Sequence, residues 1–174
     1  MPVETFNTIN ALSVLLFGAF ALVTLLVILA RHSFGQFIAR HTSLILRVIF
    51  VGAVLGSFTY EFVFGYAPCL LCWYQRMAIF PIAILLFTAD IRKSALLRKQ
   101  VIILASLGLL VALAHNYIDI VPSGLDICGA GPSCLLRYVN VFGFVTIPFM
   151  SAVVLTCGIV FAVASKRYPH PSRI

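Results

Sequence analysis

Long apolar runs alternate with short basic segments along the whole chain. A helix that spans a bilayer needs about 20 mostly apolar residues. Five runs reach that length, at residues 10–30, 44–66, 70–89, 101–120 and 141–165. Because the hydrocarbon core offers exposed backbone groups no hydrogen-bonding partner, runs of this length must be helical. The pattern therefore predicts an all-α membrane protein with five transmembrane helices.

Composition supports this prediction and excludes several other classes of protein. The 174 residues are 62% hydrophobic and 10% charged, whereas soluble domains average about 45–50% apolar and about 25% charged residues. So little polar surface excludes an ordinary soluble enzyme, a disordered chain and a nucleic-acid-binding protein. The net charge of +7 lies between the apolar runs, as is typical of membrane proteins.

The basic residues indicate the orientation in the membrane. Ten of the 12 lie in the first link, in the third link or in the C-terminal tail, and five spans put these segments on one side. The positive-inside rule makes that side cytoplasmic, so we expect the N-terminus outside and the C-terminus in the cytoplasm. No basic residue precedes the first run and no small-residue cleavage site follows it, so we expect a retained helix and not a signal peptide.

Four of the five cysteines fall on the predicted outer side, where disulfides persist. Cys69 and Cys72 lie at the outer end of the third helix, and Cys128 and Cys134 lie in the loop before the fifth. Cys157 lies inside an apolar run and is typical of a small buried residue.

The first pair, Cys69-Leu-Leu-Cys72, follows a proline that suits a helix start. Its thiols share one helix face, and a helix N-terminus lowers thiol pKa and so favours exchange. An inert disulfide is the alternative.

The second pair, Cys128 and Cys134, encloses Gly-Ala-Gly-Pro-Ser, which favours a turn that closes as a disulfide. One alternative is a disulfide with a purely structural role, and another is a zinc site formed by the four thiolates of both pairs. Two pairs on one side suggest a relay of thiol–disulfide exchange.

Three ionisable residues lie at similar depth beneath the thiols: Glu61, Arg76 and His115. Such residues cost about 2.5–3.5 kcal/mol at the centre of a span and usually mark a functional site. The Arg76 guanidinium can stabilise charge on the carbonyl oxygen of a quinone, unless it extends to the headgroups instead. His115 can relay protons or donate to a carbonyl, or be merely packed. For Glu61 we expect a structural role, paired with Arg76 or protonated.

The segment Pro-Cys-Leu-Leu-Cys-Trp-Tyr-Gln-Arg, residues 68–76, resembles the signature of the DsbB/BdbC disulfide bond formation proteins. Residues 143–148 and 114–117 also resemble family segments, the latter in the short BdbC-like branch. The resemblance covers residues 44–165. It implies a four-helix transmembrane bundle, so the chain would carry one additional N-terminal transmembrane helix, to which we assign no chemistry.

The resemblance also implies a membrane thiol:quinone oxidoreductase that uses ubiquinone or menaquinone. By position, Cys72 would face the quinone, Arg76 would bind it, and Cys69 would exchange with the loop pair. Cys128 would form the mixed disulfide with a thioredoxin-fold thiol oxidase of the DsbA/BdbD kind, and Cys134 would resolve it.

We therefore predict a multi-pass enzyme of the bacterial cytoplasmic membrane that supports disulfide formation in exported proteins, with both cysteine pairs on the outer face and no metal ligands. The predicted parts are an N-terminal helix with its cytoplasmic link, the bundle and a basic cytoplasmic tail, at residues 1–43, 44–165 and 166–174. One alternative is a thiol-driven quinone reductase of the vitamin K epoxide reductase type. Another is a metal-binding membrane protein that uses the four outer cysteines.

Overall fold

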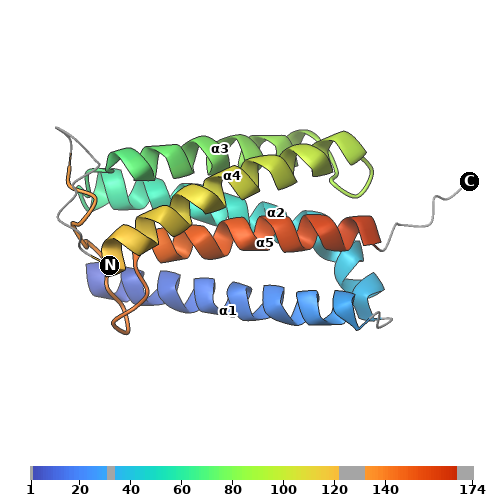
Figure 1. Ribbon diagram of the computed structural model, residues 1–174, viewed down its shortest axis with the longest axis horizontal. Helices are drawn as coiled ribbons and strands as arrows, with labels where there is room; N and C mark the ends of the chain where they lie inside the picture. The colour runs from blue at the N-terminus through green and yellow to red at the C-terminus, as the bar shows by residue number, and fades with distance from the viewer. Residues whose placement is uncertain (1, 31–33, 122–131, 168–174) are drawn as a thin grey trace, which may run out of the picture.

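The computed structural model describes residues 2–30, 34–121 and 132–167. Five long helices lie side by side along the long axis of the molecule (Figure 1). They are α1 (Val3–Leu29), α2 (Phe34–Phe58), α3 (Leu70–Thr88), α4 (Ala95–Ile120) and α5 (Ile147–Arg167), and a π-helical turn, η1 (Thr59–Val63), extends α2. Each of the five is long and apolar enough to cross a membrane. The predicted all-α membrane protein with five spans is confirmed.

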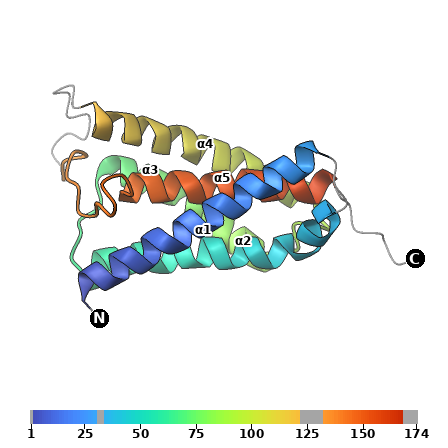
Figure 2. The same cartoon turned by 90° about the horizontal axis from the view of Figure 1, so that it is seen from below.

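Helices α2 to α5 form a four-helix bundle, and α1 lies outside it. The central helix is α5, which packs on α1, α2 and α4 and is the most buried of the five spans. Helix α1 crosses α5 and α2 diagonally on one face of the bundle and is the least buried (Figure 2). This arrangement is the predicted bundle with one additional N-terminal helix.

Two glycines allow the central helices to approach closely. A Cβ atom added at Gly108 of α4 would lie 2.6 Å from the Cβ of Ala78 on α3, and one at Gly158 of α5 would lie 2.9 Å from the ring of Phe50 on α2. Small residues at such crossings let helices pack backbone to backbone in a membrane.

The fifth helix begins at Ile147, and the predicted start at residue 141 is wrong. Residues 141–145 form a tight turn, closed by a bridge between Val141 and Val145, in which Gly143 has φ of +79°. The hydroxyl of Thr146 then caps the helix by accepting a hydrogen bond from the backbone N–H of Phe149 at 3.5 Å. The apolar run therefore includes a turn that hydropathy alone does not separate from the helix.

Other helices extend beyond the predicted apolar runs. The first begins at Val3 and not at residue 10, and the second begins at Phe34 and not at residue 44, although with η1 it ends at Val63 and not at residue 66. The fourth begins at Ala95, because the hydroxyl of Ser94 caps it by accepting from the N–H of Leu97 at 3.1 Å. The last helix continues to Arg167, so the predicted tail is helical at its start.

The connections before α3 and before α5 lie at the end of the bundle where α1 begins (Figure 1). The link between α3 and α4 lies at the opposite end and is rich in basic residues. There Arg92 donates to the carboxylate of Asp90 at 2.6 Å and to the carbonyl of Arg40 at 2.7 Å, which joins this link to α2.

The close crossing at Gly108 generates a prediction. Gly108→Ala places a methyl group against Ala78, and forced overpacking costs about 1–3 kcal/mol. We expect a lower thermal unfolding midpoint in detergent. Gly52→Ala is the matched control, because a Cβ there has no atom within 4 Å and alanine improves helix propensity by about 0.5–1 kcal/mol. Equal midpoints for the two variants would contradict the close crossing.

Candidate active site

The first turn of α3 holds two adjacent free thiols. Cys69 is the N-cap residue, and its sulfur accepts a hydrogen bond from the backbone N–H of Cys72 at 3.4 Å. The two sulfurs lie 2.8 Å apart. Because a disulfide joins sulfurs at about 2.05 Å, a small side-chain rotation suffices to close the pair. The two predicted cysteines at the start of α3 therefore lie close enough to form a disulfide.

His115 reaches this pair from α4 and lies buried between Cys69 and Cys134. Its Nε2 lies 3.9 Å from the sulfur of Cys69 and 3.2 Å from the carbonyl oxygen of Cys134. The side-chain amide nitrogen of Gln75 lies 3.1 Å from Nδ1. If this amide donates to Nδ1, the ring proton is on Nε2 and points toward Cys69 and Cys134.

The surroundings of Cys69, which lies just outside the third span, favour its thiolate. A hydrogen bond from Cys72 lowers the pKa of the Cys69 thiol most, burial opposes this, and the hydrogen bond from His115 lowers the pKa further. A thiolate is the form that attacks disulfides. Cys69 is therefore the more nucleophilic sulfur of the pair.

Cys134 lies directly against the helix pair. It is disulfide-bonded, 5% exposed, and packs with Cys69 in a small buried cluster. Arg137 anchors this segment to the end of α4 by donating to the carboxylate of Asp119 at 2.5 Å and also to its carbonyl. The structure thus brings one loop cysteine to the helix thiols. Cys128, its predicted partner, lies outside the described residues.

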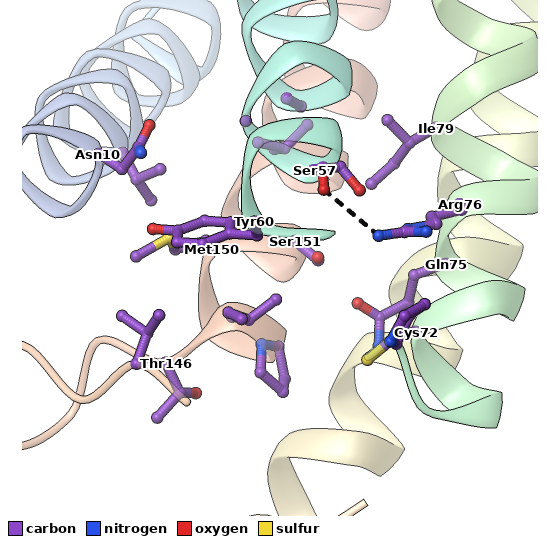
Figure 3. A pocket seen from close by; sticks show the side chains of 18 of the residues that line it. Asn10, Ser57, Tyr60, Cys72, Gln75, Arg76, Ile79, Thr146, Met150 and Ser151 are labelled. Atoms are coloured by element: carbon purple, nitrogen blue, oxygen red, sulfur yellow. Dashed lines mark hydrogen bonds between the residues drawn. The ribbon is translucent and has the colours of Figure 1, made fainter. Parts of the chain in front are cut away.

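Arg76 is buried and held on three sides, so it does not extend to the headgroups. Its guanidinium forms an ion pair with Glu61 of η1 and donates to the carbonyl of Ser57 at 3.4 Å (Figure 3). It also lies over the ring of Trp73, 5.0 Å from the centroid. The expected pairing of Glu61 with Arg76 is confirmed. Single π-turns such as η1 are frequent at functional sites.

A mostly apolar cavity of about 320 Å³ lies beside the thiols. Cys72, Gln75 and Arg76 border it from α3, and Tyr60 lies on the opposite side (Figure 3). Helix α1 supplies a further wall, lined by Asn10, Ser13, Val14 and Phe17. The sequence analysis assigned this helix no chemistry. Asn10 and Ser13, three positions apart in a mostly apolar run, were the available signal.

Cys157 is fully buried in the core, as predicted. Its thiol donates to the backbone carbonyl of Phe17 at 3.6 Å. This contact joins α5 to α1 at a helix crossing and indicates a packing role.

A family model described as "Disulfide bond formation protein DsbB" matches residues 39–165. The chain belongs to the DsbB family. The match includes both cysteine pairs, Arg76 and His115, and it starts after α1. Helix α1 is therefore an addition to the matched DsbB region.

Relatives with similar names support this assignment. The chain is 34% identical over 116 residues to "Disulfide bond formation protein C" of Bacillus subtilis (strain 168), which covers 66% of this chain and 84% of the relative. It is 33% identical over 118 residues to the "SPbeta prophage-derived disulfide bond formation protein B" of the same organism, over 65% of this chain and 80% of the relative. A "Probable disulfide formation protein" of Oceanobacillus iheyensis is 36% identical over 104 residues, or 58% and 72% of the two chains.

No solved structure matches the chain significantly. The DsbB family and its named relatives make the chain a multi-pass membrane enzyme of disulfide formation, an oxidoreductase.

The contact between His115 and Cys69 generates a prediction about pH. Alkylation by iodoacetamide follows the thiolate fraction, so the reduced protein should react at Cys69 well below the ordinary thiol pKa of about 8.5. His115→Ala removes a hydrogen bond that lowers the pKa of Cys69. The variant should therefore react more slowly at pH 6 and recover as the pH rises.

The modified sulfur is located by mass spectrometry in a background that retains only the helix pair, with serine at Cys128, Cys134 and Cys157. His41→Ala is the matched control, because His41 is exposed and its ring nitrogen lies 3.1 Å from the backbone carbonyl of Phe37 on its own helix. Identical pH profiles for His115→Ala and the parent would contradict the assignment.

Proposed function

We propose that this DsbB-family enzyme is a thiol:quinone oxidoreductase. It reoxidises a thioredoxin-fold thiol oxidase of the DsbA/BdbD kind and passes the electrons to ubiquinone or menaquinone in the bilayer. The position of the helix pair carries the proposal. Cys69 packs against Cys134, and both Cys69 and Cys72 border the cavity that Arg76 also lines. A pair so placed can receive electrons from the loop and deliver them to a ligand in the cavity.

Two exchanges connect the partner to the helix pair. A thiolate of the partner attacks the loop disulfide, which forms a mixed disulfide at Cys128 and releases Cys134. The second partner thiol then displaces Cys128 and leaves both loop cysteines reduced, whereas Cys134 resolves the same mixed disulfide in the reverse direction. A loop thiolate then attacks the Cys69–Cys72 disulfide, and closure of the loop disulfide releases both helix thiols. Each exchange forms one S–S bond and breaks another, so two electrons and two protons move to the helix pair.

His115 has a position that serves the second exchange. Its Nε2 contacts Cys69 and the carbonyl of Cys134, so it can donate to the Cys69 thiolate next to the loop. Gln75 holds the ring in this orientation. Because His115 also borders the cavity, we propose that it contacts the quinone as well.

The cavity fits the expected quinone in size and chemistry. Its volume of about 320 Å³ falls within the range of about 300–1,000 Å³ that is usual for ligand pockets, and its mostly apolar lining suits a flat ring. When bound, a quinone supplies a two-electron acceptor. Arg76 would hold a carbonyl oxygen and stabilise negative charge there, and Glu61 and Ser57 keep the guanidinium oriented.

We orient the thiol end toward the outer face of the bacterial cytoplasmic membrane. The basic link between α3 and α4 and the basic end of α5 lie at the opposite end of the bundle, which the positive-inside rule assigns to the cytoplasm. The N-terminus and both cysteine pairs then face the outside, where a soluble partner can reach the loop.

Reconstitution tests the proposal. The protein is purified in detergent, and reduction of added ubiquinone or menaquinone by a reduced thioredoxin-fold dithiol protein is followed. We expect catalytic turnover, its loss in Cys69→Ser and in Cys128→Ser, and retention in Cys157→Ser, whose thiol has a packing role. A folded wild-type protein that reduces neither quinone would contradict the proposal.

Arg76→Ala should impair the acceptor side selectively. Loss of one donor to a developing oxyanion costs about 10²–10³ in rate, so we expect slower quinone reduction, while a single-turnover exchange with the reduced partner keeps its rate. Arg76→Ala with Glu61→Gln controls for the charge left unpaired on Glu61. Arg92→Ala, at the other end of the bundle, is the matched arginine control. Unchanged quinone kinetics in Arg76→Ala would exclude the assigned role.

Cys134→Ser should trap the complex with the partner. In this variant the Cys128 thiolate attacks the disulfide of the oxidised partner, and the mixed disulfide persists because no Cys134 thiol is present to displace the partner. The complex then runs as a larger species in non-reducing electrophoresis. The converse variant, Cys128→Ser, should accumulate much less of it. If only Cys128→Ser traps the partner, through Cys134, the two roles are reversed.

A further inference from the structure

Three ligand atoms of metal-binding type converge at the helix pair. The sulfurs of Cys69 and Cys72 and the imidazole of His115 offer atoms that all lie within 4.8 Å of one another. We propose that the reduced enzyme binds one Zn²⁺ ion at this site, through both thiolates and Nε2 of His115. Two cysteines and one histidine are a known zinc ligand set that leaves a fourth position open.

The distances suit zinc after one adjustment. Tetrahedral geometry with Zn–S of about 2.3 Å and Zn–N of about 2.0–2.1 Å separates sulfur from nitrogen by about 3.6 Å and the two sulfurs by about 3.8 Å. The sulfur of Cys69 lies 3.9 Å from Nε2 already, whereas the two sulfurs lie 2.8 Å apart. Cys72 therefore has to turn away from Cys69 by about 1 Å. Cys72 borders the cavity, which leaves room for that rotation.

Gln75 supplies the support that a metal-binding histidine needs. Such a histidine almost always donates its second ring N–H to a neighbouring acceptor, which fixes the tautomer. The amide of Gln75 lies 3.1 Å from Nδ1 of His115. With its oxygen turned to this position, the amide accepts the Nδ1–H, and the lone pair of Nε2 is then available to the metal.

Charge balance also favours the ion. Both sulfurs bind as thiolates, so Zn²⁺ and two thiolates form a neutral group, and a neutral group is less costly to bury than separate charges. The carbonyl oxygen of Cys134 lies 3.2 Å from Nε2 and is a candidate for the fourth position. Zinc binding thus replaces the hydrogen bond from His115 to the loop.

Zinc and the disulfide compete for the same two sulfurs. A zinc-bound pair has no free thiolate for exchange and stays reduced, so zinc would block the enzyme reversibly. This consequence rests on the proposed function, whereas zinc binding itself does not.

The binding experiment uses the full chain in detergent, reduced with a phosphine, stripped by a chelator and titrated with Zn²⁺ or Co²⁺. We expect one ion per chain, release of the Cys72 proton on binding, and thiolate–Co²⁺ absorption bands. The same protein oxidised with diamide should bind none, which tests the site without a variant that must fold.

Variants locate the ligands. Replacing both loop cysteines, Cys128 and Cys134, by serine should leave zinc affinity intact. Gln75→Leu should weaken it by about 10–100-fold, the usual effect of losing a group that supports a metal ligand. His115→Ala should weaken it at least as much, and His41→Ala should have no effect. Equal binding by oxidised protein, loss of binding in the loop variant, or undiminished binding in His115→Ala would overturn the proposal.

A turnover assay separates this inference from the proposed function. We expect zinc to stop quinone reduction and a chelator to restore it. Zinc binding without quinone reduction in the wild type would contradict the proposed function and leave the zinc site standing. Quinone reduction without zinc binding by the reduced protein would overturn the zinc site alone.

Discussion

The ion pair between buried Arg76 and partly buried Glu61 is the interaction on which the site depends. A charge within a bilayer is costly unless it is paired, and removing one partner of a buried pair leaves the other uncompensated. The pair joins α3 to η1, and Arg76 lies two turns below Cys69 on the same helix. It therefore fixes the end of α2 relative to the helix thiols, and the cavity forms between these elements and α1, with α5 as a further wall.

Much of the fold follows from the sequence, because spanning a bilayer constrains a chain more strongly than folding in water. Run length and charge placement suffice to predict five helices. The helix ends are less predictable, since they depend on capping hydroxyls, at Ser94 and Thr146, and on a turn at residues 141–145 that is as apolar as the helix after it. Hydropathy records how apolar a segment is and contains no information about where its hydrogen bonding changes.

Part of the candidate site could likewise be predicted from the sequence, and part of it could not. Cys69, Cys72 and Arg76 were predictable together because positions i, i+3 and i+7 share one helix face. The placement of His115 between Cys69 and Cys134 depends on the crossing of α3 with α4 and on the anchoring of the loop, which are tertiary contacts. The contribution of α1 to the cavity could not be predicted either, because scattered polar residues in a mostly apolar helix do not specify which of its faces meets the bundle.

Helix α1 changes the connectivity of the molecule as well as its cavity. It makes the number of crossings odd, so the chain starts at the end of the bundle that holds the thiols, while α5 finishes at the other end (Figure 1). A bundle of α2 to α5 alone would have both ends on the basic side. A soluble domain joined ahead of α1 would thus emerge beside Cys69 and the loop. The architecture is therefore compatible with tethering a redox partner covalently to its own oxidase, which would replace a diffusional encounter by a high local concentration.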